Sequence, residues 1–190
     1  YKNLSSKTLR EALYYTIPNH FDEGLRHFGP FSPFSFAVQE GLYTYQQDIS
    51  HAQLLLDKFK NASLGAKLSL TIDTLPQYNG VAETISKIWN SLEIETRIQI
   101  TDKVPSNFQV FLGEFSLPPD PDQYVLWHSD QINNITHYSN LRIDKLLEDG
   151  RQTNDIEKRK KIYADFQKYI LSDPPASFLF FPYTYDVARK

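Results

Sequence analysis

The chain contains no cysteine and no methionine among its 190 residues. Without cysteine it has no disulfide, no thiolate ligand for zinc and no cysteine nucleophile. Because the chain does not begin with methionine, we expect it to be a fragment or a processed form, so a missing targeting signal carries no information. The 7 glycines are scattered, and the sequence has neither a Gly-rich phosphate loop nor a Gly-x-Ser-x-Gly elbow.

Long apolar runs and blocks of like charge are also missing. No stretch approaches the ~18 apolar residues that cross a bilayer. The 20 basic and 23 acidic residues are interspersed and give a formal net charge of -3, which argues against nucleic acid as a partner. The 5 histidines show no helical zinc-site spacing. From this pattern we expect no metal site and no cofactor.

Apolar residues are abundant enough to build a core. With 41% hydrophobic and 14% aromatic residues, residues 1–190 are expected to form a single domain. Apolar residues at helical spacing predict helices over residues 6–17, 48–59, 81–92, 141–149 and 155–171. Thr8 with Glu11 is expected to form a capping box on the first helix, and Asp48 or Ser50 to open the second.

Alternating apolar and polar residues predict strands between these helices. The expected strands cover residues 68–72, 94–100, 108–112 and 178–185. The order strand–helix–strand from 68 to 100 indicates a βαβ unit with parallel strands and a right-handed crossover. The proline-rich segments 29–34 and 114–122 are expected to be irregular. The predicted fold class is α/β, a mixed and mostly parallel sheet flanked by helices.

Six short strings follow one another along the chain. They are Leu-Arg-Glu-Ala-Leu-Tyr-Tyr at 9–15, Tyr-x-x-Asp with a later Ala and Leu-Leu at 45–56, Ile-Trp-x-x-Leu-x-Ile at 88–94, Tyr-Ser-Asn with a later Asp-x-Leu-Leu at 138–147, Asp-x-x-Lys-Arg-x-x-x-Tyr at 155–163, and Asp-Pro-Pro at 173–175. In this order and spacing they resemble the C-terminal lobe of family 5 extracellular solute-binding proteins, the peptide- and nickel-type receptors of ABC importers. Glu93 stands where that family customarily has glycine.

The resemblance implies a lobe of the periplasmic binding protein-like II fold. On this basis the chain is the C-terminal (second) lobe of a bilobed protein, and the first, N-terminal lobe is absent from it. The implied function is capture of oligopeptides or dipeptides in an inter-lobe cleft and delivery to the transmembrane permease subunits. The implied location is extracytoplasmic, either periplasmic or as a membrane-anchored lipoprotein at the cell surface. The implied protein is not an enzyme.

The resemblance also points to ligand-binding residues. In relatives, the strand that ends near Gly113 leads into a Gly-Trp-x-x-Asp loop whose acidic residue holds the α-ammonium of the peptide. Here Glu114 stands at the tryptophan position and Leu117 at the aspartate position. Either Glu114 takes over the charge, or the ligand has no free amino terminus; a solvated loop carboxylate is the structural alternative. Trp127 is either an apolar pocket wall or part of the core. The predicted ligand-binding residues are Glu114, Phe115, Ser116, Leu117 and Trp127.

Three other functions stay open from the sequence. Leu117 leaves room for a different cargo in the same family, such as an oligosaccharide, a metal chelate or a signalling peptide. A small hydrolase or transferase would need carboxylates, and those available here are Asp120, Asp122 and Glu114. The Asp-Pro-Asp string is also ordinary turn and helix-start chemistry. A scaffold or adhesion module would expose an aromatic patch, for which the candidates are Phe31, Phe34 and Phe36.

Overall fold

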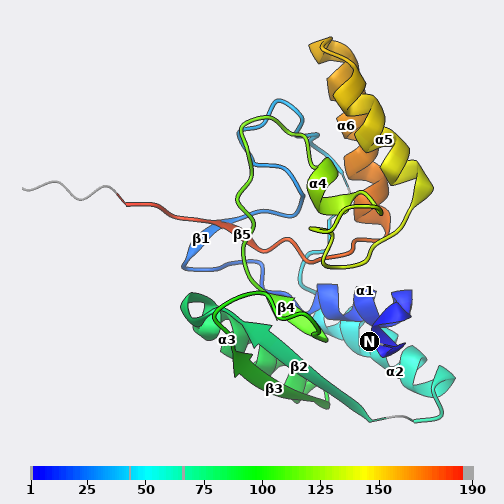
Figure 1. Cartoon of the computed structure of the whole chain (residues 1–190). Coiled ribbons are helices and arrows are strands. Elements are labelled where there is room, and N and C mark those ends of the chain that lie inside the picture. The colour runs from blue at the N-terminus through cyan, green and yellow to red at the C-terminus, as the bar shows by residue number, and fades with distance from the viewer. Residues whose placement is uncertain (1, 43, 66, 186–190) are drawn as a thin grey trace, which may run out of the picture. The chain divides into compact units, whose positions relative to one another are not determined.

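The computed structural model describes residues 2–42, 44–65 and 67–185 (Figure 1). The chain divides into two compact units. Unit 1 comprises Tyr1–Asp22 and Tyr45–Phe115, and unit 2 comprises Glu23–Thr44 and Ser116–Lys190. The single domain expected for residues 1–190 stays a prediction, because a lobe can contain more than one compact unit. Within the described ranges, no helix is both long and apolar enough to cross a membrane.

Unit 1 is built on a three-stranded parallel sheet in the order β3-β2-β4. The central strand β2 (Leu68–Thr74) pairs along its whole length with β3 (Ile94–Ile100), and its last three residues pair with β4 (Val110–Leu112). Between β2 and β3 the chain forms α3 (Asn79–Ser91), which packs against the sheet (Figure 1). The predicted βαβ unit with parallel strands is therefore confirmed. Burial alternates from Leu68 to Ile72 of β2, as a period of two requires, and the last two residues, Asp73 and Thr74, are both buried as well.

The other helices of unit 1 begin at side chains that cap them. Besides α3, the unit contains η1 (Lys2–Ser5), α1 (Lys7–Tyr15), α2 (Ile49–Ala62) and η2 (Pro76–Tyr78). The Oγ of Ser6 accepts a hydrogen bond from the Leu9 backbone N at 3.4 Å, so the capping box expected at Thr8 and Glu11 was wrong. Thr8 already lies in the first helical turn, because Ser6 is the extended residue before it. Asp48 caps α2 through the His51 N at 2.8 Å, as predicted.

A buried hydrogen bond ties α3 to the end of α1 inside unit 1. Trp89 Nε1 donates to Thr16 Oγ1 at 2.7 Å, and Thr16 Oγ1 donates onward to the Leu13 carbonyl at 2.6 Å. Both Trp89 and Thr16 are almost fully buried. A buried indole N–H needs such a partner, since leaving it unsatisfied costs about 1–3 kcal/mol. The bond thereby fixes how the two helices pack.

Glu93 has a backbone conformation that explains why glycine is customary at its position. Its φ of 61° lies in the left-handed region, where residues other than glycine are uncommon. The residue sits between α3 and β3, where the chain must turn sharply from helix to strand. The Glu93 side chain also receives a hydrogen bond from Lys60 Nζ at 2.7 Å, and this cation lowers the pKa of the carboxyl.

Unit 2 combines helices with a small antiparallel sheet. Its elements are β1 (Gly24–Arg26), α4 (Tyr124–Trp127), α5 (Leu141–Gln152), α6 (Ile156–Ser172) and β5 (Phe180–Pro182). Helices α5 and α6 pack together and begin at the caps Asn140 and Asp155, which confirms both predicted helix starts. The core residues are Phe31, Ala37, Trp127, Ile143, Leu147, Tyr163, Phe166, Ile170 and Leu171. The aromatic loop 29–34 thus contributes Phe31 to this core.

Strand β1 was not foreseen, and β5 is shorter than the predicted strand 178–185. β1 and β5 pair antiparallel, with Gly24 opposite Pro182. A side chain at Gly24 would place its Cβ 2.2 Å from the Phe181 carbonyl oxygen, so only glycine fits at this crossing. A three-residue strand carries too little alternation to be seen in a sequence. Its partner lies more than 150 residues away in the chain, which explains why β1 escaped prediction.

Candidate ligand-binding site

The candidate site in unit 1 begins where β2 and β4 end. The two strands are neighbours in the parallel sheet, and the strand order β3-β2-β4 puts the next strand along the chain, β3, on one side of β2 and the following strand, β4, on the other side. Such a reversal is the point at which open α/β sheets bind ligands, at the carboxyl ends of the strands. Gly113, Glu114 and Phe115 follow β4 directly at this edge.

Glu114 is exposed and held by a tyrosine from the neighbouring strand end. Tyr78, which follows β2 in η2, donates its hydroxyl to Glu114 Oε2 in a short hydrogen bond. The tyrosine itself is 9% exposed. Burial, together with the hydrogen bond to Glu114 and its negative charge, raises the pKa of Tyr78 to about 12. Tyr78 therefore remains a neutral donor at every physiological pH and keeps the carboxylate of Glu114 in one position.

The backbone around this pair is also fixed. Thr74, the last residue of β2, donates its hydroxyl to the Leu112 carbonyl at 3.2 Å, and Thr101 N donates to the Thr74 carbonyl at 2.8 Å. The ends of all three strands are thereby connected. A carboxylate on this frame is preorganised to accept hydrogen bonds from a cation or an N–H donor.

The remaining predicted site residues belong to unit 2, apart from Phe115, which is exposed in unit 1. Ser116 is exposed and Leu117 is half-buried. Trp127 is 4% exposed in the core of unit 2, where its ring meets Phe178 edge-on and its Nε1 donates to Gln123 Oε1 at 2.8 Å. These contacts make Trp127 part of the core of unit 2, which is one of the two interpretations that the sequence allowed. A contact between Trp127 and a ligand stays a prediction.

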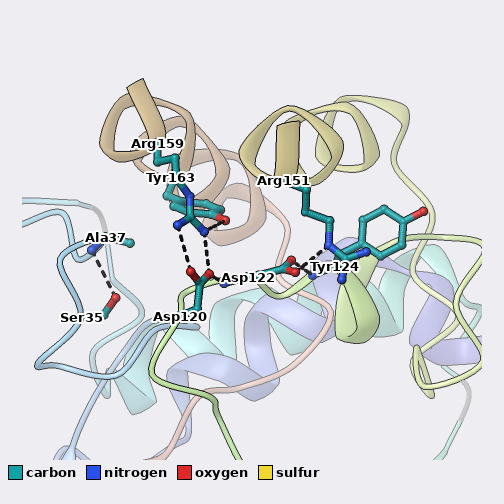
Figure 2. A network of polar contacts seen from close by, with 8 residues as sticks. All are labelled: Ser35, Ala37, Asp120, Asp122, Tyr124, Arg151, Arg159 and Tyr163. Atoms are coloured by element: carbon teal, nitrogen blue, oxygen red, sulfur yellow. Dashed lines mark hydrogen bonds and ion pairs between the residues drawn. The ribbon is translucent and has the colours of Figure 1, made fainter. Parts of the chain in front are cut away.

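The segment that follows Leu117 is clamped to α5 and α6 by two arginines (Figure 2). Arg159 of α6 binds both oxygens of Asp120, at 2.9 and 2.6 Å, and Arg151 at the end of α5 binds Asp122 at 2.6 Å. Figure 2 shows the two carboxylates side by side, each below its own arginine. Pro121 between them is buried. The Asp-Pro-Asp string is therefore an anchored corner.

Each clamp has further support. Arg159 also donates to the Tyr163 hydroxyl at 3.0 Å, and the Arg151 guanidinium lies 4.2 Å from the ring centre of Tyr124. The Arg159 guanidinium holds the pKa of the Asp120 carboxyl below its usual value. Both aspartates also accept backbone hydrogen bonds two residues ahead, an arrangement typical of turns.

These contacts bear on the alternatives left open by the sequence. Asp120 and Asp122 are each engaged by a permanent cation, which is the arrangement of structural carboxylates. Within the described residues no group of three or more His, Asp or Glu side chains is placed to hold a metal ion. Among the aromatic candidates, Phe31 is 1% exposed, while Phe34 is 91% exposed.

The sequence pointed to Glu114 but missed the residues that position the neighbouring segments. Tyr78, Arg151 and Arg159 lie 36, 29 and 39 residues from their carboxylate partners. The only available signal was the presence of two arginines near the starts and ends of predicted helices. That signal is too common to identify an ion pair.

Comparison with known proteins gives a consistent set of relatives, although no family model matches the chain. Over 134 residues the chain is 32% identical to the oligopeptide-binding protein AppA of Bacillus subtilis, which covers 62% of this chain and 24% of AppA. The solved structure of B. subtilis AppA in complex with a nonapeptide superposes with a TM-score of 0.86 at 23% identity, over 96% of this chain and 43% of AppA.

Two further solved structures show the same fold. NikZ of Campylobacter jejuni in complex with Ni(L-His) has a TM-score of 0.85 at 22% identity, over 95% of this chain and 43% of that chain. DppA of Helicobacter pylori is described as an ABC transporter-associated periplasmic binding protein in complex with the peptide STSA. It has a TM-score of 0.84 at 21% identity, over 97% of this chain and 40% of that chain. The chain thus spans less than half the length of the proteins that it matches.

The fold and these relatives define the class: the chain has the periplasmic binding protein-like II fold of solute-binding proteins. Within that class, the resemblance to the family 5 oligopeptide-, dipeptide- and nickel-binding proteins, drawn first from short strings, is confirmed. The α/β fold class expected from the sequence is confirmed with it.

Proposed function

We propose that this chain is the C-terminal lobe of a substrate-binding component of an ABC importer that captures oligopeptides or dipeptides. Ligand would enter between this lobe and an N-terminal lobe, and closure about a hinge would bury it. The closed form would then be recognised by the transmembrane permease subunits. This function places the protein outside the cytoplasm, in a periplasm or anchored to the cell surface.

The observation that carries this proposal is the agreement between the chain and peptide-bound AppA over 96% of the chain. The position of Glu114 supports it independently. An exposed carboxylate at the carboxyl ends of β2 and β4, held in place by Tyr78, offers an acceptor for the N–H groups and cations of a peptide. The sequence-predicted contacts of Phe115, Ser116, Leu117 and Trp127 with the ligand belong to this proposal.

A binding function accounts for the site better than catalysis does. The carboxylates that an enzyme would use are each engaged: Asp120 by Arg159, Asp122 by Arg151 and Glu114 by Tyr78. A general acid or base needs a pKa near the operating pH. The pKa of Asp120 is shifted the other way, below its ordinary value, because of Arg159. We therefore propose that the protein is not an enzyme.

A second cargo is favoured by the similarity to NikZ, whose solved complex contains Ni(L-His) and whose TM-score is nearly that of AppA. A metal–histidine complex also carries amino groups that a carboxylate such as Glu114 accepts. The two cargoes share a receptor mechanism and differ in the contents of the cleft. Direct identification of the bound ligand is needed to decide between the two cargoes.

The experiment is to purify the complete polypeptide that contains this chain without denaturation and to identify what it carries. Native mass spectrometry followed by acid release is expected to show peptides. If nickel with histidine or a sugar is released instead, the protein is still a solute receptor, but peptides are not its cargo. Calorimetry on the 190-residue chain provides a second measurement: because the proposed mechanism needs contacts from both lobes, we expect no micromolar affinity for the released peptide. Micromolar binding by the single chain would contradict the two-lobe mechanism.

A matched pair of variants tests the role of Glu114 in the complete polypeptide. Glu114→Gln keeps the shape of the side chain and removes its charge, so we expect about tenfold weaker binding of the released ligand. Glu95→Gln makes the same change at an exposed carboxylate on β3 that pairs with Arg97 at 3.0 Å, and should leave binding unchanged. Equal affinities for both variants and the parent protein would remove Glu114 from the site.

A further inference from the structure

Asp73 is a buried carboxylate without a hydrogen-bond or ion-pair partner among the residues that the structure describes. It is the penultimate residue of the central strand β2 and is 6% exposed. Its flanking residues in the sheet are Gln99 of β3 and Phe111 of β4. In the part of the chain that the structure describes, no side chain or backbone group donates a hydrogen bond to its carboxylate, and no cation pairs with it.

Such a group costs stability. Burial without a partner disfavours the ionised carboxylate and raises the pKa of Asp73 above its ordinary value. No structural role offsets this cost: Asp73 caps no helix and lies inside a regular strand. Ser69 and Thr71, which precede it on the same face of β2, are small, neutral and half-buried. Polar groups retained against stability are commonly functional.

The charged neighbours on this face of the sheet do not neutralise Asp73. On β2, β3 and β4 the charged side chains that share its face are Glu95 and Arg97, by the alternation of the strands. These two already pair with each other at 3.0 Å. On β4 the residue beside Asp73 is Phe111, which brings no charge. A cation for Asp73 must therefore come from elsewhere.

The carboxylate is also accessible to such a cation. In the described ranges, the fully enclosed side-chain atoms without a hydrogen bond are Thr101 Oγ1 and Arg159 Nε. The oxygens of Asp73 are not among them, so they retain contact with solvent. Asp73 is one residue from the carboxyl end of β2, and its partner strand β4 leads two residues later into Gly113 and Glu114. The carboxylate thus stands at the edge of the sheet where the proposed ligand site lies.

We propose that Asp73 is a specificity-determining residue that binds a cationic nitrogen of the ligand, an ammonium or a guanidinium. This inference rests on the proposed solute-binding function and adds to it the charge of the ligand group at this position. When such a cation binds, it forms an ion pair with the carboxylate. The ion pair in the complex offsets the free energy that burial of the unpaired carboxylate costs. A neutral ligand would gain nothing from Asp73.

The first test needs no ligand. Asp73→Asn is compared with the parent chain by urea unfolding at several pH values, with Glu95→Gln as the control on the same sheet face. Because the folded pKa of Asp73 is raised, ionisation opposes folding above that pKa. Asp73→Asn should therefore be more stable than the parent at pH 7, and the difference should shrink as pH falls through the raised pKa. A variant that is less stable at pH 7 would show that the carboxylate has a structural partner, which overturns the proposal.

The second test measures which charge Asp73 recognises. Three probes are added to the isotope-labelled chain at matched ionic strength and followed by NMR: trialanine, with an α-ammonium; N-acetyl-Ala-Lys-Ala amide, with a side-chain ammonium; and N-acetyl-trialanine amide, with neither. In the parent chain and in Glu95→Gln, at least one cationic probe should bind about tenfold more tightly than the neutral one. In Asp73→Asn that preference should disappear. The probe that shows it identifies the source of the cation.

The outcomes separate this inference from the proposed function. If all three probes bind alike and Asp73→Asn changes nothing, the chain binds peptides but Asp73 does not read their charge. If a cationic preference persists in Asp73→Asn, another carboxylate supplies it and the assignment to Asp73 is wrong. If no probe shifts any resonance in any variant, the cation site at Asp73 is contradicted, whereas the receptor function, which requires both lobes, is tested by the ligand that the complete polypeptide carries.

Discussion

The clamp between Arg159 and Asp120 allows a quantitative test of how the loop in unit 2 is held. Asp120→Asn retains the size of the side chain and the oxygen that accepts from the Asp122 backbone N at 2.9 Å. It removes the negative charge and one of the two acceptors of the arginine fork. The Arg159 side chain, 16% exposed, is left with one neutral acceptor at position 120 and the Tyr163 hydroxyl, while its Nε is already enclosed without a partner.

The expected loss follows from these exposures. Hydrogen bonds to charged groups contribute about 1.5–3 kcal/mol when protected from solvent, and exposed ion pairs about 0.2–1 kcal/mol. Asp120 is 52% exposed, so the pair lies between the two limits. We expect Asp120→Asn to lower the free energy of unfolding of unit 2 by about 1–2 kcal/mol, which moves the urea midpoint by roughly 0.5–1 M.

The assay uses the two tryptophans, one in each unit. Trp89→Phe leaves Trp127 as the only indole, and Trp127 is buried in the core of unit 2. Asp165→Asn, at an exposed position of the same helix α6, is the control and should leave the midpoint in place. The pKa of Asp120 is lowered by Arg159, so the stability from this pair is present above the unfolded value and lost as pH falls through the folded one. The difference in urea midpoint between the parent chain and Asp120→Asn should therefore disappear as the pH falls through the folded pKa of Asp120. An unchanged midpoint at pH 7, or a gap that persists in strong acid, would refute the reasoning.

Two further predictions concern unit 1 and the core of unit 2. Glu114→Gln removes the charge beside Tyr78, so the pKa of Tyr78 should fall from about 12 toward its ordinary value, as measured by ultraviolet titration against Tyr78→Phe. A titration identical to that of the parent chain would mean that the hydrogen bond is absent in solution. Ile170→Ala, at a fully buried position, should cost about 2–5 kcal/mol in the free energy of unfolding, whereas Ile132→Ala, at 96% exposure, should stay within about 0.5 kcal/mol. Similar losses at both sites would contradict the described core.

Local signals in the sequence determined most of the regular structure. The helices that begin at Asp48, Asn140 and Asp155 were predicted because a capping side chain and the first apolar residues lie within one helical turn. The strands 68–72 and 94–100 were predicted because alternation needs only neighbouring residues to be visible. The parallel pairing followed, since a helix between two strands leaves little other choice.

Interactions between distant residues were decided only by the tertiary structure. The candidate site illustrates this: Glu114 was predicted from the family resemblance of the loop after Gly113, but its partner Tyr78 was not, because no sequence pattern links positions 36 residues apart. The arginines that anchor the loop after Leu117 were missed for the same reason.

Asp73 shows most clearly which property of a residue cannot be predicted from the sequence alone. In the sequence it is one polar residue just past the end of the predicted strand 68–72, and alternation alone would place it on a solvent-facing side. Burial and the lack of a partner are properties of three strands together, since β3 and β4 flank the carboxylate without donating to it. The sequence by itself therefore determined the elements and the class of protein. The tertiary structure decided which charged groups are paired within the described residues and which are not, because that depends on neighbours brought together only by folding.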